Sequence, residues 1–301
     1  METSMQTNVT IGIHSYLFAT HYEIDAKKRA AFNWLSQMVF GIQFEEWYQK
    51  GGWTESFRPY TLFDKENAVA NVSVCPFELL LDGKPRRYLG LYTVMVHPDW
   101  RGLGLSRFLM ETILRDWEDQ YDQVFLFAND SVLDFYPRFG FEQVQEQAFS
   151  RILPTQPGRL IRKLNMACPA DRMLLQKQIA AATPLARVSI RNLWGMALFQ
   201  ALYELEFYVC REPDAVLCIE REKGRITLHD CFCAHPLPLN ELARMIPAEN
   251  GDLLTLGFTP LRSSGWTAAP VQRKDSTTFL LTGRENPFLQ QPMLFPTLVH
   301  A

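Results

Sequence analysis

The most informative stretch of the chain is Leu91-Tyr-Thr-Val-Met-Val-His-Pro-Asp-Trp-Arg-Gly-Leu-Gly-Leu-Ser-Arg107. It predicts a buried strand that ends at a proline, a short glycine-containing loop and then a helix. Loop amides and a helix N-terminus, which carries roughly half a positive charge, together form a site for an anion such as phosphate. Gly104 lets the backbone approach a ligand closely or adopt a positive φ. The stretch therefore predicts a phosphate-bearing cofactor.

Two common phosphate-binding motifs are missing from this loop. A nucleotide-hydrolysing P-loop has a Lys-Ser/Thr pair after its last glycine, whereas this chain has Leu105, Ser106 and Arg107. A dinucleotide fingerprint requires G-x-G-x-x-G, and here Arg107 replaces the third glycine. The loop matches neither motif, and the missing Lys-Ser/Thr pair excludes phosphoryl transfer.

The motif that remains is Arg-x-x-Gly-x-Ser, from Arg101 to Ser106, after a Val-x-Val-x-Pro strand. It resembles the coenzyme A pyrophosphate loop of the GCN5-related N-acetyltransferases (the GNAT family), whose pattern is Gln/Arg-x-x-Gly-x-Gly/Ala. Ser106 departs from that pattern, but serine is small and keeps its N–H. The resemblance implies acetyl-CoA as the cofactor. The cofactor-binding residues that it implies are Val94, Met95, Val96, Arg101, Gly102, Leu103, Gly104, Leu105, Ser106, Arg107 and Asn129.

A second segment strengthens the resemblance. Residues 123–128 form an apolar run typical of a strand, and Asn129-Asp-Ser131 is a helix-start signal. Residues 135–141 resemble the family's Phe-Tyr-x-x-x-Gly-Phe segment. In that family the strand before Asn129 splays from the strand of Val94–Val96, and the pantetheine arm lies between them. The resemblance places Tyr136 beside the thioester sulfur as the catalytic acid, although Tyr136 alone would be interpreted as a half-buried aromatic residue.

The general base is not identified by the sequence. A lysine-like amine with a pKa near 10.4 is mostly protonated at neutral pH, so a base or a water chain must take its proton. Glu45, Glu46 and Glu78 are candidates by chain region, and each is equally compatible with a solvated surface carboxylate. His97 is interpreted as structural. The aromatic residues of 47–57 either line an acceptor pocket or pack in the core, and core packing is the simpler interpretation.

The predicted elements favour an α+β fold in which helices flank a mixed, mostly antiparallel sheet. Their order matches the acyl-CoA N-acyltransferase fold over about residues 8–153. The expected helices span 26–40, 44–48 and 105–114, and the expected strands span 60–63, 68–81, 88–96 and 123–128, with 144–152 as the closing strand. Asp82-Gly83 is a hairpin turn signal. Pro154 and Pro157-Gly158 mark a break, so residues 1–155 are predicted to form the catalytic domain.

The second half, residues 156–301, resembles a degenerate copy of the first, giving two such domains in tandem. Its predicted strands span 215–220, 225–233, 252–258 and 277–281, and its helix spans 239–245. Pro236 and Pro238 remove two N–H donors where the first half has its phosphate loop. This half is therefore expected to bind no coenzyme A and to form a wall of the substrate cleft or a dimer surface. The alternative is an unrelated α+β domain.

Composition excludes several classes of function. The 301 residues are 47% hydrophobic and carry a net charge of −3, with no long charged run, so neither nucleic acid nor a membrane surface is an expected partner. No stretch of about 18 uncharged apolar residues occurs. The six scattered cysteines fit reduced thiols in the cytoplasm. His229, Cys231, Cys233 and His235 alternate along a predicted strand, where same-face neighbours lie about 6.6 Å apart, too far for one tetrahedral zinc ion; no metal is expected.

These observations together predict an N-acetyltransferase that transfers acetyl from acetyl-CoA directly to a primary amine. The acceptor, a small molecule or a peptide, is not identified, and a homodimer is compatible with the sequence. One alternative is a catalytically inactive acyl-CoA-binding sensor or assembly protein, because no base is evident and Ser106 departs from the pattern. An aminoacyl-transferase built from paired halves is less well supported, because the cofactor loop is intact.

Overall fold

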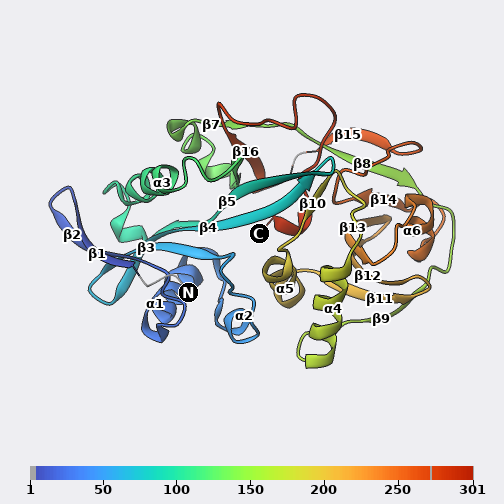
Figure 1. Cartoon of the computed structure of the whole chain (residues 1–301), viewed down its shortest axis with the longest axis horizontal. Coiled ribbons are helices and arrows are strands. Elements are labelled where there is room, and N and C mark those ends of the chain that lie inside the picture. The colour runs from blue at the N-terminus through green and yellow to red at the C-terminus, as the bar shows by residue number, and fades with distance from the viewer. Residues whose placement is uncertain (1–4, 272, 301) are drawn as a thin grey trace. The chain divides into compact units, whose positions relative to one another are not determined.

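The computed structural model describes residues 5–271 and 273–300 (Figure 1). The chain forms two compact units, each assembled from three segments. Unit 1 comprises Met1–Phe77, Arg87–Glu142 and Phe279–Arg284. Unit 2 comprises Glu78–Arg86, Gln143–Thr278 and Glu285–Ala301. That residues 1–155 form an independent domain stays a prediction.

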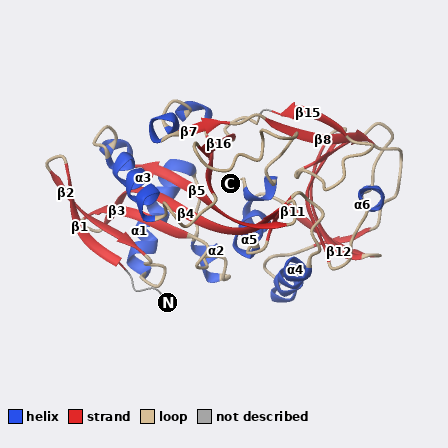
Figure 2. Cartoon of the chain, turned by 45° about the horizontal axis from the view of Figure 1, so that its top comes forward, coloured by secondary structure: helices blue, strands red, loops and turns tan. Residues whose placement is uncertain are grey.

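Unit 1 is built on a mixed sheet with the strand order β1-β2-β3-β4-β5-β6-β16-β7 (Figure 2). The strands are β1 (Met5–Ile11), β2 (His14–Thr20), β3 (Arg58–Asp64), β4 (Asn67–Leu81), β5 (Lys84–Val96), β6 (Gln123–Ala128), β16 (Thr277–Leu281) and β7 (Phe141–Gln143). The helices are α1 (Ala26–Phe40), α2 (Glu45–Gln49), α3 (Leu105–Asp116) and the 3₁₀-helices η1 (Pro98–Trp100), η2 (Asp130–Val132) and η3 (Tyr136–Phe139). Strands β1 to β4 pair antiparallel, whereas β5 and β6 pair in parallel.

Local sequence signals explain where several of these elements begin and end. Helix α1 begins after Asp25, whose carboxylate accepts from the N–H groups of Lys27 and Lys28, and ends at Gly41 with a φ of 73°. Asp82 and Gly83 have φ values of 50° and 77°, as a tight hairpin turn between β4 and β5 requires. The predicted helix over residues 26–40 and the predicted turn at Asp82-Gly83 are confirmed.

The predicted closing strand of the first half is wrong. Residues Glu146–Ile152 do form a strand, β8, but it lies in the sheet of unit 2, between β15 and β14. The place beside β6 in the first sheet is taken by β16, whose Phe279 and Leu280 are buried. An alternating pattern predicts that a segment is a strand, but its partner is chosen by tertiary packing.

Unit 2 contains the second sheet, of order β15-β8-β14-β13-β12-β11-β9. Its remaining strands are β9 (Leu160–Lys163), β11 (Glu206–Arg211), β12 (Asp214–Glu222), β13 (Arg225–Cys233), β14 (Leu253–Leu256) and β15 (Thr267–Val271). A short strand, β10 (Val188–Ile190), pairs with Leu79–Leu81 at the end of β4. The helices are α4 (Pro169–Ala181), α5 (Trp194–Tyr203), α6 (Leu239–Met245) and the 3₁₀-helix η4 (Thr297–Val299).

The two sheets repeat one local arrangement. Four residues of β5 pair in parallel with four of β6, and four residues of β13 pair in parallel with four of β14. Helix α6 follows Pro236 and Pro238, as predicted. That unit 2 descends from a copy of unit 1 stays a prediction. None of the helices in the described residues has both the length and the hydropathy to cross a membrane.

Candidate functional site

The loop predicted to bind phosphate lies between β5 and α3 in unit 1. The chain leaves β5 through η1 and then passes Gly102 and Gly104, whose φ values are 78° and 81°. A side chain would be strained at either position. A Cβ on Gly102 would meet no atom within 4 Å, and one on Gly104 would meet only Ile11 Cγ2, at 3.9 Å. The glycines therefore face open space, as a loop that lets a ligand approach its backbone requires.

Helix α3 begins at this loop without a side-chain cap. Its first helical hydrogen bond runs from the N–H of Phe108 to Gly104 O, at 3.0 Å, so the amides of Leu105, Ser106 and Arg107 precede the helical ladder. The buried side chains of Leu105 and Leu109 hold the helix on the sheet.

The loop itself stays exposed. Residues 101–104 and Arg107 are exposed, and Ser106 is half-buried. The two arginines add positive charge to the partial charge of the helix N-terminus. A run of amides beside Arg101 and Arg107 suits a polyanion such as a pyrophosphate.

Strands β5 and β6 separate beside the loop. In the described part of the chain, their parallel register runs from Tyr88 opposite Gln123 to Leu91 opposite Leu126 and goes no further. Val94, Met95 and Val96 therefore lie on the part of β5 that has left β6. Asn129 follows the end of β6 and is exposed. Backbone groups along separated strands need other partners, and an amide-bearing ligand could supply them.

The separated part of β5 contains a strained residue, Thr93, with a φ of 44°. A β-branched residue with a positive φ is a genuine outlier, and such strain persists only where the surroundings hold it. The amide of Asn71, on β4, donates to the carbonyl oxygen of Thr93 at 3.1 Å and contacts its hydroxyl at 3.0 Å. Thr93 also donates its hydroxyl proton to Ser73 at 2.7 Å.

This polar network continues into the core. The hydroxyl of Thr61 donates to Asn71 Oδ1 at 2.7 Å, and Tyr22 Oη lies 2.6 Å from Thr61 Oγ1. Since the Thr61 proton is used on Asn71, the phenol of Tyr22 is the donor to Thr61. All four residues of the chain Tyr22, Thr61, Asn71 and Ser73 are fully buried. Sequence reasoning missed them, although polar residues at 71 and 73 inside an otherwise apolar strand were a signal.

Tyr136, the predicted acid, lies at the start of η3 and is buried, with 5% of its surface exposed. Its ring packs against Phe135 and Phe279, with centroids 5.2 and 5.8 Å away. Burial raises the pKa of its phenol to about 12. The described residues offer its hydroxyl no hydrogen-bond partner. A neutral phenol without a protein acceptor has its proton available for a ligand.

Two of the three candidate bases, Glu45 and Glu46, are held in ion pairs. Glu45 accepts from Arg29 at 3.2 and 3.3 Å, and this interaction lowers the pKa of Glu45. Glu46 pairs with Lys50 at 3.4 Å. Glu78 is exposed and belongs to unit 2. His97 is buried, stacks on Trp34 at 5.3 Å and accepts from the N–H of Asp99 at 3.2 Å, which supports a structural role.

The aromatic stretch of residues 47–57 forms core, as the simpler interpretation predicted. Trp47, Trp53 and Phe57 are each buried, and Trp53 packs edge-to-face on Phe57 at 5.0 Å. Phe32 and Phe44 complete the cluster. Side chains enclosed in this way are not available to line an acceptor pocket.

The cysteine- and histidine-rich strand forms part of β13. His229 Nδ1 lies 2.8 Å from Thr297 Oγ1, and Cys231 and Cys233 are buried free thiols. Within residues 5–271 and 273–300, no group of three or more His, Cys, Asp or Glu side chains is placed to hold a metal ion.

Comparison with known proteins agrees with this geometry. Residues 22–144 match the model of an acetyltransferase (GNAT) domain. The matched range includes the loop, the separated strands and Tyr136. The chain thus contains an acyltransferase domain of the GNAT family. Curated protein sequences give no match.

Solved structures extend the likeness over both units. A conserved protein of Enterococcus faecalis, described as a probable N-acyltransferase, is 14% identical with a TM-score of 0.54, covering 92% of this chain and 72% of that one. A GCN5-related N-acetyltransferase from Kribbella flavida is 16% identical with a TM-score of 0.53, covering 87% and 71%. Eis1 from Mycobacterium abscessus is 15% identical with a TM-score of 0.51, covering 92% and 73%. At these identities the likeness establishes a shared fold, the acyl-CoA N-acyltransferase fold in two tandem sheets.

Proposed function

We propose that the chain transfers an acetyl group from acetyl-CoA directly to a primary amine on a small molecule or a peptide. The observation that carries the proposal is the open loop at the N-terminus of α3, next to strands that separate after Leu91. The loop has room for the pyrophosphate of acetyl-CoA, because a Cβ at Gly102 would meet nothing within 4 Å and residues 101–104 are exposed. When bound, acetyl-CoA supplies a thioester whose thiolate leaves readily.

Each part of the site has a role in this proposal. The amides of residues 102–107, with Arg101, bind the pyrophosphate. Backbone groups of Val94, Met95 and Val96 bind the amides of the pantetheine arm, and an N–H there polarises the thioester carbonyl. Asn129 lies at the facing strand end. Tyr136 holds the proton that the leaving sulfur requires, and its raised pKa keeps it protonated at neutral pH.

The acceptor amine must lose a proton before or during attack. Because Glu45 and Glu46 are held in ion pairs, we infer that water at the site accepts this proton. Direct attack then needs no covalent intermediate on the chain, since both substrates are held together. Free thiols at all six cysteines agree with a reducing compartment such as the cytoplasm.

The test combines calorimetry with acetyl-CoA and a thiol-release assay over a panel of amines. Binding followed by thiol release with at least one amine supports the proposal. Binding without release on any acceptor would favour the alternative, an acyl-CoA-binding sensor or assembly protein. That alternative is favoured by one observation, that Glu45 and Glu46, the candidate bases of unit 1, are already ion-paired. Absence of binding would overturn both.

A further inference from the structure

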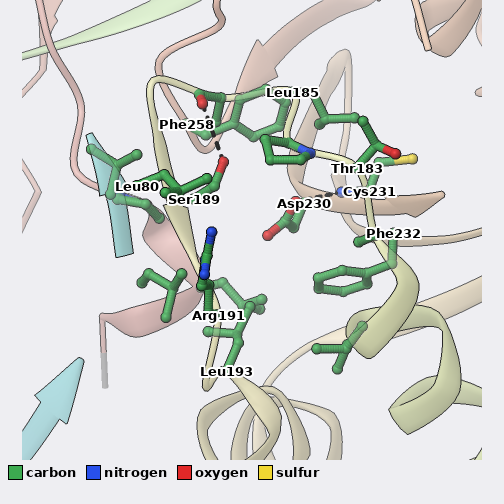
Figure 3. A pocket seen from close by; sticks show the side chains of 18 of the residues that line it. Leu80, Thr183, Leu185, Ser189, Arg191, Leu193, Asp230, Cys231, Phe232 and Phe258 are labelled. Carbon is green, nitrogen blue, oxygen red and sulfur yellow. Dashed lines mark hydrogen bonds between the residues drawn. The ribbon is translucent and has the colours of Figure 1, made fainter. Parts of the chain in front are cut away.

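Unit 2 contains a pocket of about 430 Å³ at the point where β13 and β14 separate (Figure 3). The parallel register of these strands ends at Leu228 opposite Leu256. The last hydrogen bond between them runs from the N–H of Gly257 to Leu228 O, at 2.7 Å. Beyond this point Asp230, Phe232 and Phe258 line the pocket. The pocket therefore lies at the carboxyl ends of two parallel strands, a common position for ligand sites in sheets that contain parallel strands.

The segment 183–187 bridges the two strand ends. The N–H of Thr183 donates to Cys233 O at 2.8 Å, and its hydroxyl donates to Ala234 O at 2.9 Å. The N–H of Arg187 donates to Thr259 O at 2.8 Å, and its guanidinium forms a bidentate pair with Asp82. These bonds fix the wall of the pocket, so the cavity is preformed.

Most of the lining is apolar, and Asp230 is the one acidic side chain in it. The apolar part of the lining includes Leu80, Leu185, Leu193, Phe232, Phe258 and Leu298. In Figure 3 the carboxylate of Asp230 points into the space enclosed by the labelled lining residues. One of its oxygens accepts from the N–H of Cys231 at 2.7 Å.

No cation of the protein pairs with this carboxylate. The described residues give Asp230 no ion-pair partner, and burial raises its pKa to about 6. Asp230 is half-buried. A carboxylate without an ion-pair partner beside apolar side chains is poorly stabilised, and a bound cation would stabilise it. Arg191 also lines the pocket, but its side chain is exposed and has no ion pair among the described residues. Arg191 is therefore the more solvated of the two charged side chains, and Asp230 is the better placed to pair with a ligand in the pocket.

We propose that this pocket binds a small primary amine with an apolar body, whose ammonium group pairs with Asp230 while its body packs on Phe232, Phe258 and Leu185. A volume of about 430 Å³ lies within the range of small-molecule sites. The ammonium group would donate to the carboxylate oxygen of Asp230 that does not accept from Cys231. Such charge-assisted hydrogen bonds are stronger than hydrogen bonds between neutral groups. The site goes beyond the proposed acetyl transfer, because all of its residues belong to unit 2.

The test uses 2-phenylethylamine and its neutral counterpart 2-phenylethanol, measured by calorimetry on the full chain without acetyl-CoA. The amine is expected to bind at least tenfold more tightly than the alcohol. Asp230→Asn keeps the acceptor for the N–H of Cys231 but removes the charge, and should weaken amine binding at least tenfold. Arg191→Gln is the matched control at the same pocket and should leave amine binding unchanged or stronger.

Three results would overturn the proposal: no binding of the amine at millimolar concentration, equal affinity for the alcohol, or equal amine affinity in Asp230→Asn. Folding of the variant is checked by its melting temperature, which should be unchanged or higher because a half-buried charge without an ion-pair partner is lost. Binding of acetyl-CoA, measured separately, reports on the loop of unit 1. The two proposals can therefore fail independently.

Discussion

The side-chain amide of Asn71 donates to the backbone carbonyl of Thr93 at 3.1 Å, joining β4 to the one strained residue of β5. Thr93 lies two residues beyond the last parallel pair of β5 and β6, where the strands separate. A buried amide thus holds the backbone at the place where the proposed acyl site begins. The strain at Thr93 is maintained by hydrogen bonds that reach back to Tyr22.

Removing this support should affect both stability and activity. Asn71→Ala should lower the free energy of unfolding by about 1–3 kcal/mol, because Thr61 and Thr93 each lose a buried partner. It should also lower kcat for acetyl transfer, because the backbone at Thr93 can relax. Urea unfolding and steady-state kinetics measure the two effects. Tyr22→Phe, which removes only the far end of the network, should destabilise without changing kcat. If Asn71→Ala leaves kcat unchanged, the network is structural only.

The glycine loop can be tested against a glycine of matched conformation. Gly104→Ala and Gly83→Ala both place a Cβ at a positive φ, 81° and 77°, with no atom closer than 3.9 Å. Each should therefore cost about 1–2 kcal/mol of stability. Only Gly104→Ala should also weaken acetyl-CoA binding, by at least tenfold in calorimetry. Equal acetyl-CoA affinity in the two variants would contradict a role for this loop.

Tyr136→Phe should lower kcat by about tenfold or more, with little change in acetyl-CoA affinity. The ring contacts with Phe135 and Phe279 are kept, and only the proton donor is lost. Because burial raises the pKa of Tyr136 to about 12, its titration should not limit activity up to about pH 10. Tyr60→Phe is the control, since its hydroxyl accepts from Trp117 Nε1 at 3.0 Å inside the same unit. An unchanged kcat in Tyr136→Phe would remove Tyr136 as the acid.

The position of β16 predicts that residues 1–155 will not fold stably alone. That fragment lacks the strand between β6 and β7, so both would present open edges and Tyr136 would lose Phe279. Circular dichroism should show no cooperative thermal transition for residues 1–155. Attaching residues 275–285 through a flexible linker should restore one. A cooperative transition in the bare fragment would show that the predicted first domain is self-sufficient.

Asp171 should make the stability of unit 2 depend on pH. It accepts from Arg162 at 2.6 and 2.7 Å and from the N–H of Asn165 at 2.8 Å, and these bonds hold its pKa below the ordinary value. A carboxyl whose pKa is lowered by folding stabilises above its unfolded pKa of about 3.9, and this contribution is lost as pH falls through the folded pKa. Asp171→Asn should therefore be less stable than the parent at pH 7.

The difference between Asp171→Asn and the parent should shrink as pH falls below about 4 in a series of urea unfolding curves. Glu206→Gln is the control, because Glu206 pairs with Lys163 at an exposed position, where solvent screens the interaction. At pH 7, the free energy of unfolding of Glu206→Gln should differ less from that of the parent than the value for Asp171→Asn does. If the difference in unfolding free energy between Asp171→Asn and the parent is constant from pH 7 to pH 3, the ion pair with Arg162 does not contribute to stability.

The sequence alone determined the local structure of the proposed site. Two glycines, a preceding proline and an apolar helix face specify the turn between β5 and α3, because each acts through its own backbone or through neighbours a few residues away. Helix α1, the Asp82-Gly83 turn and strand β13 were predicted for the same reason. The resemblance of residues 101–106 to the coenzyme A loop of the GNAT family then indicated the family.

Tertiary structure decided the rest. The sequence could not assign β8 to the second sheet or β16 to the first, because strand pairing depends on packing between residues more than a hundred positions apart. Nor could it show that Asn71 holds Thr93 or that Glu45 is held by Arg29. It also could not show that Asp230 lies in a mostly apolar pocket with no ion-pair partner among the described residues. The sequence gives the chemical identity of each side chain. Its contact partners and its exposure to solvent depend on the folded chain.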